Sequence, residues 1–138
     1  MKRTHMVLGA CFLLTAVVAL PADIKVIANS NVNSASISTD ELKEVFLLTK
    51  NSFAGSHAEP VLEKGGATHE AFVKSYLGKT DTALQTYYRS LVFTGKASMP
   101  KTLAADAEVV AYVAKTKGAI GYVSAGAATE GVKTLEVK

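Results

Sequence analysis

The sequence is poor in the residues that cross-link or metallate small domains. Its 138 residues include one cysteine, Cys11, and three histidines. One cysteine cannot form an intramolecular disulfide, and His57 and His69, twelve residues apart, fit no short metal motif. No Gly-x-Ser-x-Gly nucleophile elbow is present, so the serines between Ser30 and Ser38 are interpreted as turn and capping residues. We therefore expect no metal, no cofactor and no enzymatic activity.

The sequence also lacks a basic stripe with interleaved aromatic residues, which argues against nucleic-acid binding. Arginine is scarce: Arg3 and Arg89 are the only two in the chain. Low-complexity tracts and internal repeats are absent as well. Four of the five tyrosines, at 76, 87, 88 and 122, are interpreted as core or half-buried residues because of their helical spacing.

The N-terminus has the pattern of a cleavable secretory signal. A basic segment, residues 1–5, precedes an uncharged apolar run over 6–20 that is shorter than the ~20 residues of a membrane-spanning helix. We predict a signal peptide over 1–22 with cleavage after Ala22; cleavage after Ala19 and a retained membrane anchor are the alternatives. The protein is then expected in the periplasm.

Cys11 lies in Leu-Gly-Ala-Cys, which is similar to a lipoprotein box. The apolar stretch before it is only a few residues long, and a second apolar run would follow it, so we interpret Cys11 as part of the signal. Residues 23–138 then form one domain of 116 residues without cysteine. Removing Lys2 and Arg3 leaves 13 basic residues against 12 acidic ones, a net charge of about +1.

Alternating hydrophobic and helical patterns succeed one another along this domain. β-branched or alternating segments predict strands over 23–28, 58–63, 119–123 and 132–137, with Pro60 placing the second at a sheet edge or strand start. Ser38 and Glu41 form a capping box before a helix through Phe46. Further helices are expected from about 68 to Gly78, from Thr80 or Asp81 to about Leu91, and over 106–117, with loops over 51–57 and 94–100. The order predicts one α/β domain.

Three segments resemble one known family. Residues 39–47 (TDELKEVFL), 87–96 (YYRSLVFTGK) and 110–123, which end in GAIGYV, are similar in order and spacing to phosphate-binding proteins of ABC transporters. The resemblance implies a periplasmic-binding fold of type II, in which two α/β lobes close on an oxyanion. Residues 23–138 suffice for about one lobe, so the expected fold is a single three-layer lobe, a mixed sheet with flanking helices.

The chain departs from this family at the residues that grip the anion. Where the family has Ser-Gly-Thr at a helix start, this sequence has Gly66, Ala67 and Thr68. The family's arginine, four residues earlier, falls on Leu62. Arg89 is the one arginine of the domain, an anchor for an anion only if a second chain approaches. Lys64 offers a point charge that Glu63 would oppose.

The resemblance and the helix start together define a candidate site. Glycines before a helix let backbone N–H groups converge where the helix dipole is positive. We expect a small oxyanion to bind at Lys64, Gly66, Ala67 and Thr68, helped by a protonated His69, with Ser30 and Asn31 as a second contact.

The sequence thus predicts an exported protein that binds phosphate or another small oxyanion, related to ABC transporter substrate-binding components. The expected partners are an inner-membrane transporter or a second copy of the chain. The alternative is a periplasmic interaction or scaffold protein that has kept the lobe and lost ligand binding.

Overall fold

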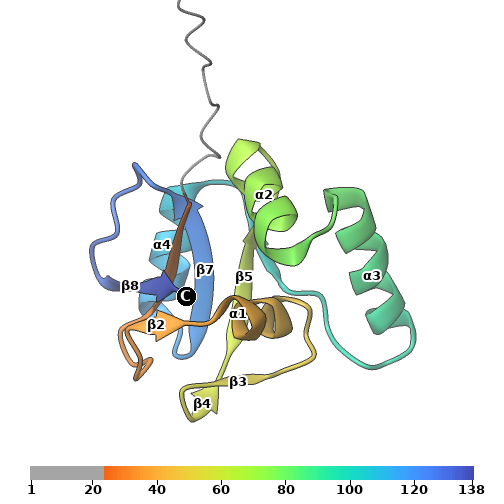
Figure 1. The fold of residues 1–138 in the computed structure, drawn as a ribbon, viewed down its shortest axis with the longest axis horizontal. Coiled ribbons are helices and arrows are strands. Elements are labelled where there is room, and N and C mark those ends of the chain that lie inside the picture. The colour runs from red at the N-terminus through yellow and green to blue at the C-terminus, as the bar shows by residue number, and fades with distance from the viewer. Residues whose placement is uncertain (1–23) are drawn as a thin grey trace, which may run out of the picture.

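The structure, a computed structural model, describes residues 24–138; the signal peptide predicted over 1–22 lies outside the described residues. The elements, shown in Figure 1, are, in chain order, β1 (Ile24–Asn29), β2 (Ser36–Ile37), α1 (Thr39–Phe46), β3 (Ser52–Phe53), β4 (Ser56–His57), β5 (Glu59–Glu63), α2 (Ala67–Phe72), the π-helical turn η1 (Val73–Leu77), α3 (Asp81–Phe93), β6 (Lys101–Leu103), α4 (Asp106–Lys115), β7 (Ala119–Ser124) and β8 (Val132–Val137).

Six strands form one mixed sheet in the order β2-β8-β1-β7-β5-β6. β5 runs parallel to β6 and β7, whereas β1 runs antiparallel to β7 and β8. The predicted α/β domain with a mixed sheet and flanking helices is therefore confirmed. The directions of the strands decide which loops share an edge of the sheet, and hence which residues can share a site.

Helices cover both faces of this sheet and make three layers. The larger core lies on the face covered by α1, α2 and η1, where Phe46, Phe72 and Tyr122 stack close together. The smaller core lies under α4 and includes Val109 and Val113. Alternating strand residues feed the two cores because successive side chains point to opposite faces.

The predicted helix boundaries are largely confirmed by their caps. Ser38 Oγ accepts the Glu41 N–H at 3.1 Å, which is one half of the expected capping box, while the Glu41 carboxylate pairs with Lys50 instead. Thr80 caps α3 through the Ala83 N–H. Gly78 ends the second helix in the left-handed conformation, φ 63°. A π-helical turn occupies the second half of that helix, which the side-chain pattern does not reveal.

Several short elements differ from the prediction. Residues 51–57, expected as a loop, contain the β3–β4 hairpin, and the short strands β2 and β6 were not expected. β5 is not an edge strand, because β6 pairs with it from Val61 onward. Pro60 lies before the first residue that pairs with β6, so its missing N–H costs no bond to that strand.

Candidate functional site

Two helices begin at the end of the sheet where the parallel strands β5 and β7 terminate. β5 leads through residues 64–66 into α2, on one face of the sheet. α4 begins on the other face, and its Asp106 carboxylate accepts the Oγ–H of Ser124, the last residue of β7, at 2.5 Å. Crevices at the carboxyl ends of parallel strands, between helices that leave on opposite faces, are the usual ligand sites of α/β sheets. We call this position in the sheet, at the carboxyl ends of the two strands, the β5–β7 crevice; the two hollows described below lie elsewhere.

The start of α2 has no internal cap. Gly66 is the N-cap residue, with φ 95° and ψ 176°, and it makes no side-chain capping bond. Gly65, Gly66 and Ala67 are exposed and Thr68 is half-buried. Among the described residues, no side chain accepts a hydrogen bond from the amides of 65–68, and a Cβ added at Gly66 would meet nothing within 4 Å. The start of α2 is therefore uncapped and largely exposed, and the positive end of the helix dipole there favours an anion.

Neither basic candidate, Lys64 or Arg89, takes the place of the arginine that the family has near this start. Lys64 is exposed, and its backbone N–H donates to the Leu103 carbonyl of β6. Leu62, at the position of the family's arginine, is buried in the larger core. Arg89 lies exposed on α3. Arg89, the single arginine of residues 24–138, forms no hydrogen bond or ion pair with the α2 start.

Ser30 and Asn31 are not part of the same site, which corrects the expectation that they form a second contact. Because β1 is antiparallel to β7, its end lies at the opposite edge of the sheet from the β5–β7 crevice. Five or six residues at about 3.3 Å each separate the two edges by roughly 15–20 Å. Asn31 is also engaged there: its Oδ1 accepts the Gly118 N–H at 3.0 Å.

His69 does not face the predicted anion either; it is a core residue with 1% of its surface exposed. Its Nδ1 is hydrogen-bonded to the Tyr122 hydroxyl, and its Nε2 lies 2.7 Å from Asp81 Oδ1. Tyr122 Oη already accepts the Glu63 N–H at 3.0 Å, so its own proton is available for Nδ1. The Nε2 N–H can then donate to Asp81.

The chain of hydrogen bonds through His69 joins three elements behind the α2 start. It ties α2 to β7 through Tyr122 and to the first residue of α3 through Asp81. The bond from His69 lowers the pKa of Asp81, and burial raises that of Tyr122 well above its ordinary value. A phenol held in this way is not a catalytic base; the network fixes the position of the helix that carries Thr68.

Glu63 is a buried carboxyl that sequence reasoning treated only as a charge opposing Lys64. It is 5% exposed, and among the described residues its Oε1 has no hydrogen-bond partner. Burial, together with a hydrogen bond and the charge of Asp106, raises its pKa to about 8. The same hydrogen bond lowers the pKa of Asp106, and the hydrogen bonds that Asp106 accepts from Ser124 lower it further. The pair holds one proton, on Glu63, at neutral pH, so Glu63 does not oppose Lys64 or an anion there.

Other features of the described residues offer no competing chemistry. No group of three or more His, Cys, Asp or Glu side chains in 24–138 could hold a metal. Hollows of about 630 Å³, between η1 and α3, and about 460 Å³, beside β4 and the α3–β6 loop, contain neither Gly66 nor Thr68. In the same part of the chain, no helix is long and apolar enough to cross a membrane.

No family model and no curated protein matches the sequence. Solved structures do match. An ABC-type phosphate transport receptor from Vibrio cholerae superposes with a TM-score of 0.65 at 13% identity, over 83% of this chain and 45% of that one. A Clostridium perfringens protein described as a phosphate ABC transporter substrate-binding protein, solved with bound phosphate, gives 0.64 at 15% over 83% and 44%. PstS from Borrelia burgdorferi gives 0.62 at 14% over 83% and 47%.

This chain folds as one periplasmic-binding-protein-type lobe. The fold expected from the sequence motifs is thereby confirmed. The chain spans less than half the length of each of these structures, so a match to their fold carries no ligand and no partner with it. The matched structures are transport binding proteins rather than enzymes.

Proposed function

We propose that this lobe binds a small oxyanion, phosphate or a group of similar shape and charge, at the α2 start in the β5–β7 crevice. One observation carries the proposal: in the described chain the α2 start has no capping side chain, residues 65–67 there are exposed, and it lies at the carboxyl ends of two parallel strands. The phosphate bound to the Clostridium protein of the same fold supports the choice of ligand class. Thr68 adds a hydroxyl and Lys64 a point charge.

The anion belongs at α2 rather than at α4. The start of α4 already carries its own acids: Glu108 accepts the Ala104 N–H at 3.0 Å, and Asp106 accepts from Ser124. Those carboxylates occupy the positive end of α4 and would repel a second anion. At α2 the acid at the strand end, Glu63, is protonated at neutral pH, and the first turn of the helix holds one further acid, the exposed Glu70.

The ligand would be held by backbone amides, because no arginine contributes. Amide donors bind all tetrahedral oxyanions by the same geometry, whereas a guanidinium fork adds strength and selectivity. We therefore expect modest affinity and weak discrimination between phosphate and sulfate. In the proposed function a second copy of the chain, or an inner-membrane transporter, closes the other side of the crevice.

Export is the second part of the proposal. The basic, apolar and small-residue order of 1–22 supports a signal cleaved after Ala22 and a periplasmic protein. The N-terminal sequence and mass of the protein recovered from the periplasmic fraction test this directly. An N-terminus at Met1 in that fraction would contradict it.

The binding test removes one amide without disturbing the helix. Ala67 is the first residue of α2, a position where proline is well tolerated, and the extended ψ of Gly66 suits a residue before proline. Ala67→Pro deletes a single N–H. A hydrogen bond to a charged ligand is worth about 1.5–3 kcal/mol, so we expect calorimetry to show phosphate binding weakened about ten- to hundredfold.

Ala67→Ser, which keeps the N–H, is the matched control and should bind as the unaltered chain does. Thr68→Val tests the hydroxyl separately. If neither phosphate nor sulfate gives heat with the unaltered chain, or if Ala67→Pro binds as well as Ala67→Ser, the site is wrong. The scaffold alternative is not favoured, because the amides that an anion requires are open rather than filled by the chain's own side chains.

A further inference from the structure

The exposed apolar residues of the described chain gather at one place. The large hydrophobic residues recorded as exposed are Val92, Phe93 and Met99, at 42%, 93% and 47% of their surfaces. All three belong to the end of α3 or the loop that follows it. We define the α3 tip as these residues with the neighbouring cations Arg89, Lys96 and Lys101.

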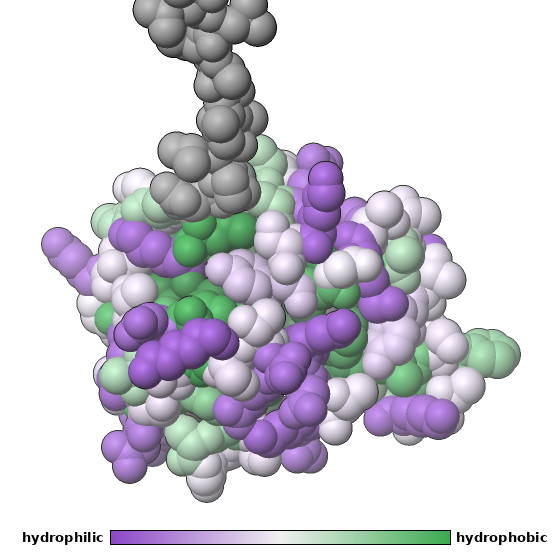
Figure 2. All heavy atoms as spheres, in the orientation of Figure 1, coloured by the Kyte–Doolittle hydropathy of each residue, from purple (hydrophilic) through white to green (hydrophobic). Residues whose placement is uncertain are grey.

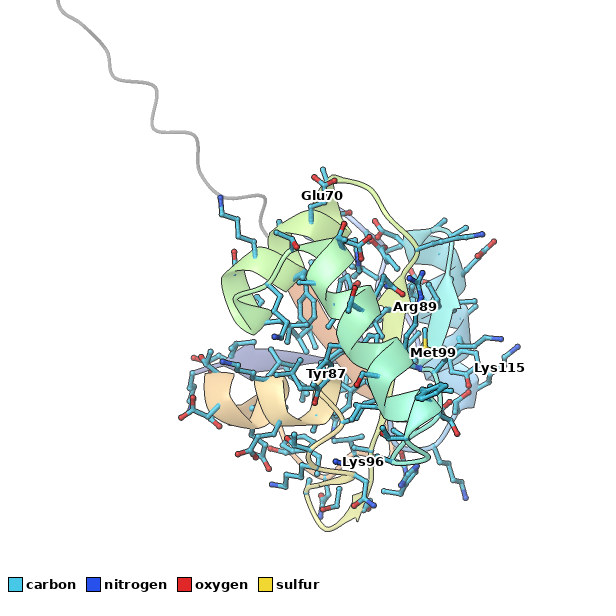
Figure 3. The ribbon with its side chains drawn as sticks, turned by 90° about the vertical axis from the view of Figure 1, so that its right-hand side faces the viewer. Glu70, Tyr87, Arg89, Lys96, Met99 and Lys115 are labelled. Carbon is cyan, nitrogen blue, oxygen red and sulfur yellow. The ribbon has the colours of Figure 1, made fainter. Side chains whose placement is uncertain are left out.

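The shape of the molecule makes the α3 tip a projection. α3 stands beyond the β6 edge of the sheet (Figure 1), and two side chains, Leu84 and Tyr88, bury it against the body. In the space-filling view an apolar group protrudes on the α3 side beside hydrophilic ones (Figure 2). Figure 3 looks onto α3 and shows Arg89, Met99 and Lys96 along the helix and beyond its end.

The charge of this segment has one sign. Residues 86–103 contain Arg89, Lys96 and Lys101 and no aspartate or glutamate. In the described part of the chain none of these three cations forms an ion pair; Lys101 lies over the Tyr112 ring, 5.4 Å from its centroid. The hollow that Lys96 lines also contains Glu59, whose carboxylate accepts the Tyr112 hydroxyl at 2.6 Å. Within the described residues, the α3 tip therefore combines exposed apolar groups with the unpaired charges of Arg89 and Lys96, while Lys101 rests on the Tyr112 ring.

We propose that the α3 tip is a peripheral contact with an anionic lipid bilayer. Cations on such a tip meet lipid phosphate groups while aromatic and aliphatic side chains enter the boundary of the acyl region. A second copy of the chain does not fit the same surface, because a two-fold contact through the tip would oppose three cations with three cations. Phe93, almost fully exposed on a convex projection, suits a fluid interface.

The test uses a fluorescent reporter at the tip itself. The sequence contains no tryptophan, so Phe93→Trp gives a single indole at the projection. A local reporter is needed because the apolar segment 6–20 can bind lipid on its own. With vesicles of equal parts phosphatidylglycerol and phosphatidylcholine we expect a blue-shifted emission and quenching by brominated acyl chains. Vesicles of phosphatidylcholine alone should give neither, and high salt should reverse the effect.

Charge reversal separates the lipid contact from a merely exposed surface. Each basic residue near an anionic surface contributes about fivefold in partitioning, so adding Lys96→Glu and Lys101→Glu to the reporter should weaken binding at least about 25-fold. Lys43→Glu with Lys74→Glu, two exposed lysines on α1 and η1, is the control of equal charge and should keep the shift.

Three outcomes would overturn the proposal. One is an emission that stays solvent-like with the anionic vesicles. Another is a shift that the Lys96→Glu/Lys101→Glu variant retains. A third is a stable dimer, seen by light scattering, that buries the indole without lipid.

Discussion

Glu63→Gln should remove most of the pH dependence of stability between pH 5 and 8. Glu63 has a pKa of about 8 in the folded chain because it is buried beside Asp106, against 4.5 for an ordinary glutamate. The folded protein therefore keeps a proton that the unfolded chain releases across this interval. Stability must fall as the pH rises, since folding becomes linked to proton uptake. Glutamine imitates the protonated carboxyl and titrates nowhere in this range.

The size of the effect follows from the shift in the pKa. One proton changes the free energy of unfolding by about 1.4 kcal/mol per pH unit, so a shift from 4.5 to about 8 sets an upper limit of about 5 kcal/mol. Relaxation around a buried charge reduces such penalties, and we expect about 2–3 kcal/mol. The lowered pKa of Asp106 acts only below its ordinary value of 3.8, so its contribution is constant over the interval.

Urea unfolding followed by circular dichroism at pH 5, 6, 7, 8 and 9 measures the free energy of unfolding at each pH. The two chains should have similar stability at pH 5 and diverge above pH 6, with Glu63→Gln the more stable. Glu70→Gln, at an exposed position of α2, is the matched control and should follow the unaltered chain. Parallel curves for all three proteins would refute the assignment of a buried, protonated Glu63.

Two further substitutions test the packing around β7. Gly118→Ala should destabilise the fold by about 3 kcal/mol or more, because a Cβ there lies 2.1 Å from a backbone oxygen at φ 78°, whereas Gly126→Ala, with nothing within 4 Å, should change the urea midpoint little. Tyr122→Phe leaves the His69 Nδ1 and one buried backbone N–H without partners, so it should cost about 2–3 kcal/mol and increase amide exchange at the start of α2. Unchanged exchange there would contradict the positioning role of the network.

The sequence was sufficient to predict the longer helices and strands and the residues at which they end. Ser38 with Glu41, Gly78 and the apolar run 119–123 are local signals, and each of them lies where its local chemistry predicts. The short strands β2 and β6 carry two and three residues, too few to show an alternation. They form because neighbouring strands offer unpaired backbone groups, which is a property of the assembled sheet.

The candidate site was only half predictable for the same reason. The glycine-led start of α2 is a local feature and was found. That Asn31 lies at the far edge depends on β1 running antiparallel to β7, and no periodicity within either strand encodes direction. The position of His69 was predicted wrongly because the local sequence does not show whether a histidine beside a helix start faces solvent or the core. Its hydrogen bonds to Asp81 and Tyr122, twelve and 53 residues away, hold it in the core.

The acidic residues of the crevice are what make an arginine-free anion site physically reasonable. Asp106 and Glu108 place two carboxylates in the first turn of α4, and the proton on Glu63 removes one negative charge from the strand ends. Neither α2 nor α4 has a capping side chain among residues 24–138, but the first turn of α2 holds one acid, Glu70, against two in α4. The His69 network joins α2 to β7 and α3. Donors that are fixed in place lose little entropy when a ligand arrives, so even a few backbone amides can bind an oxyanion with useful strength.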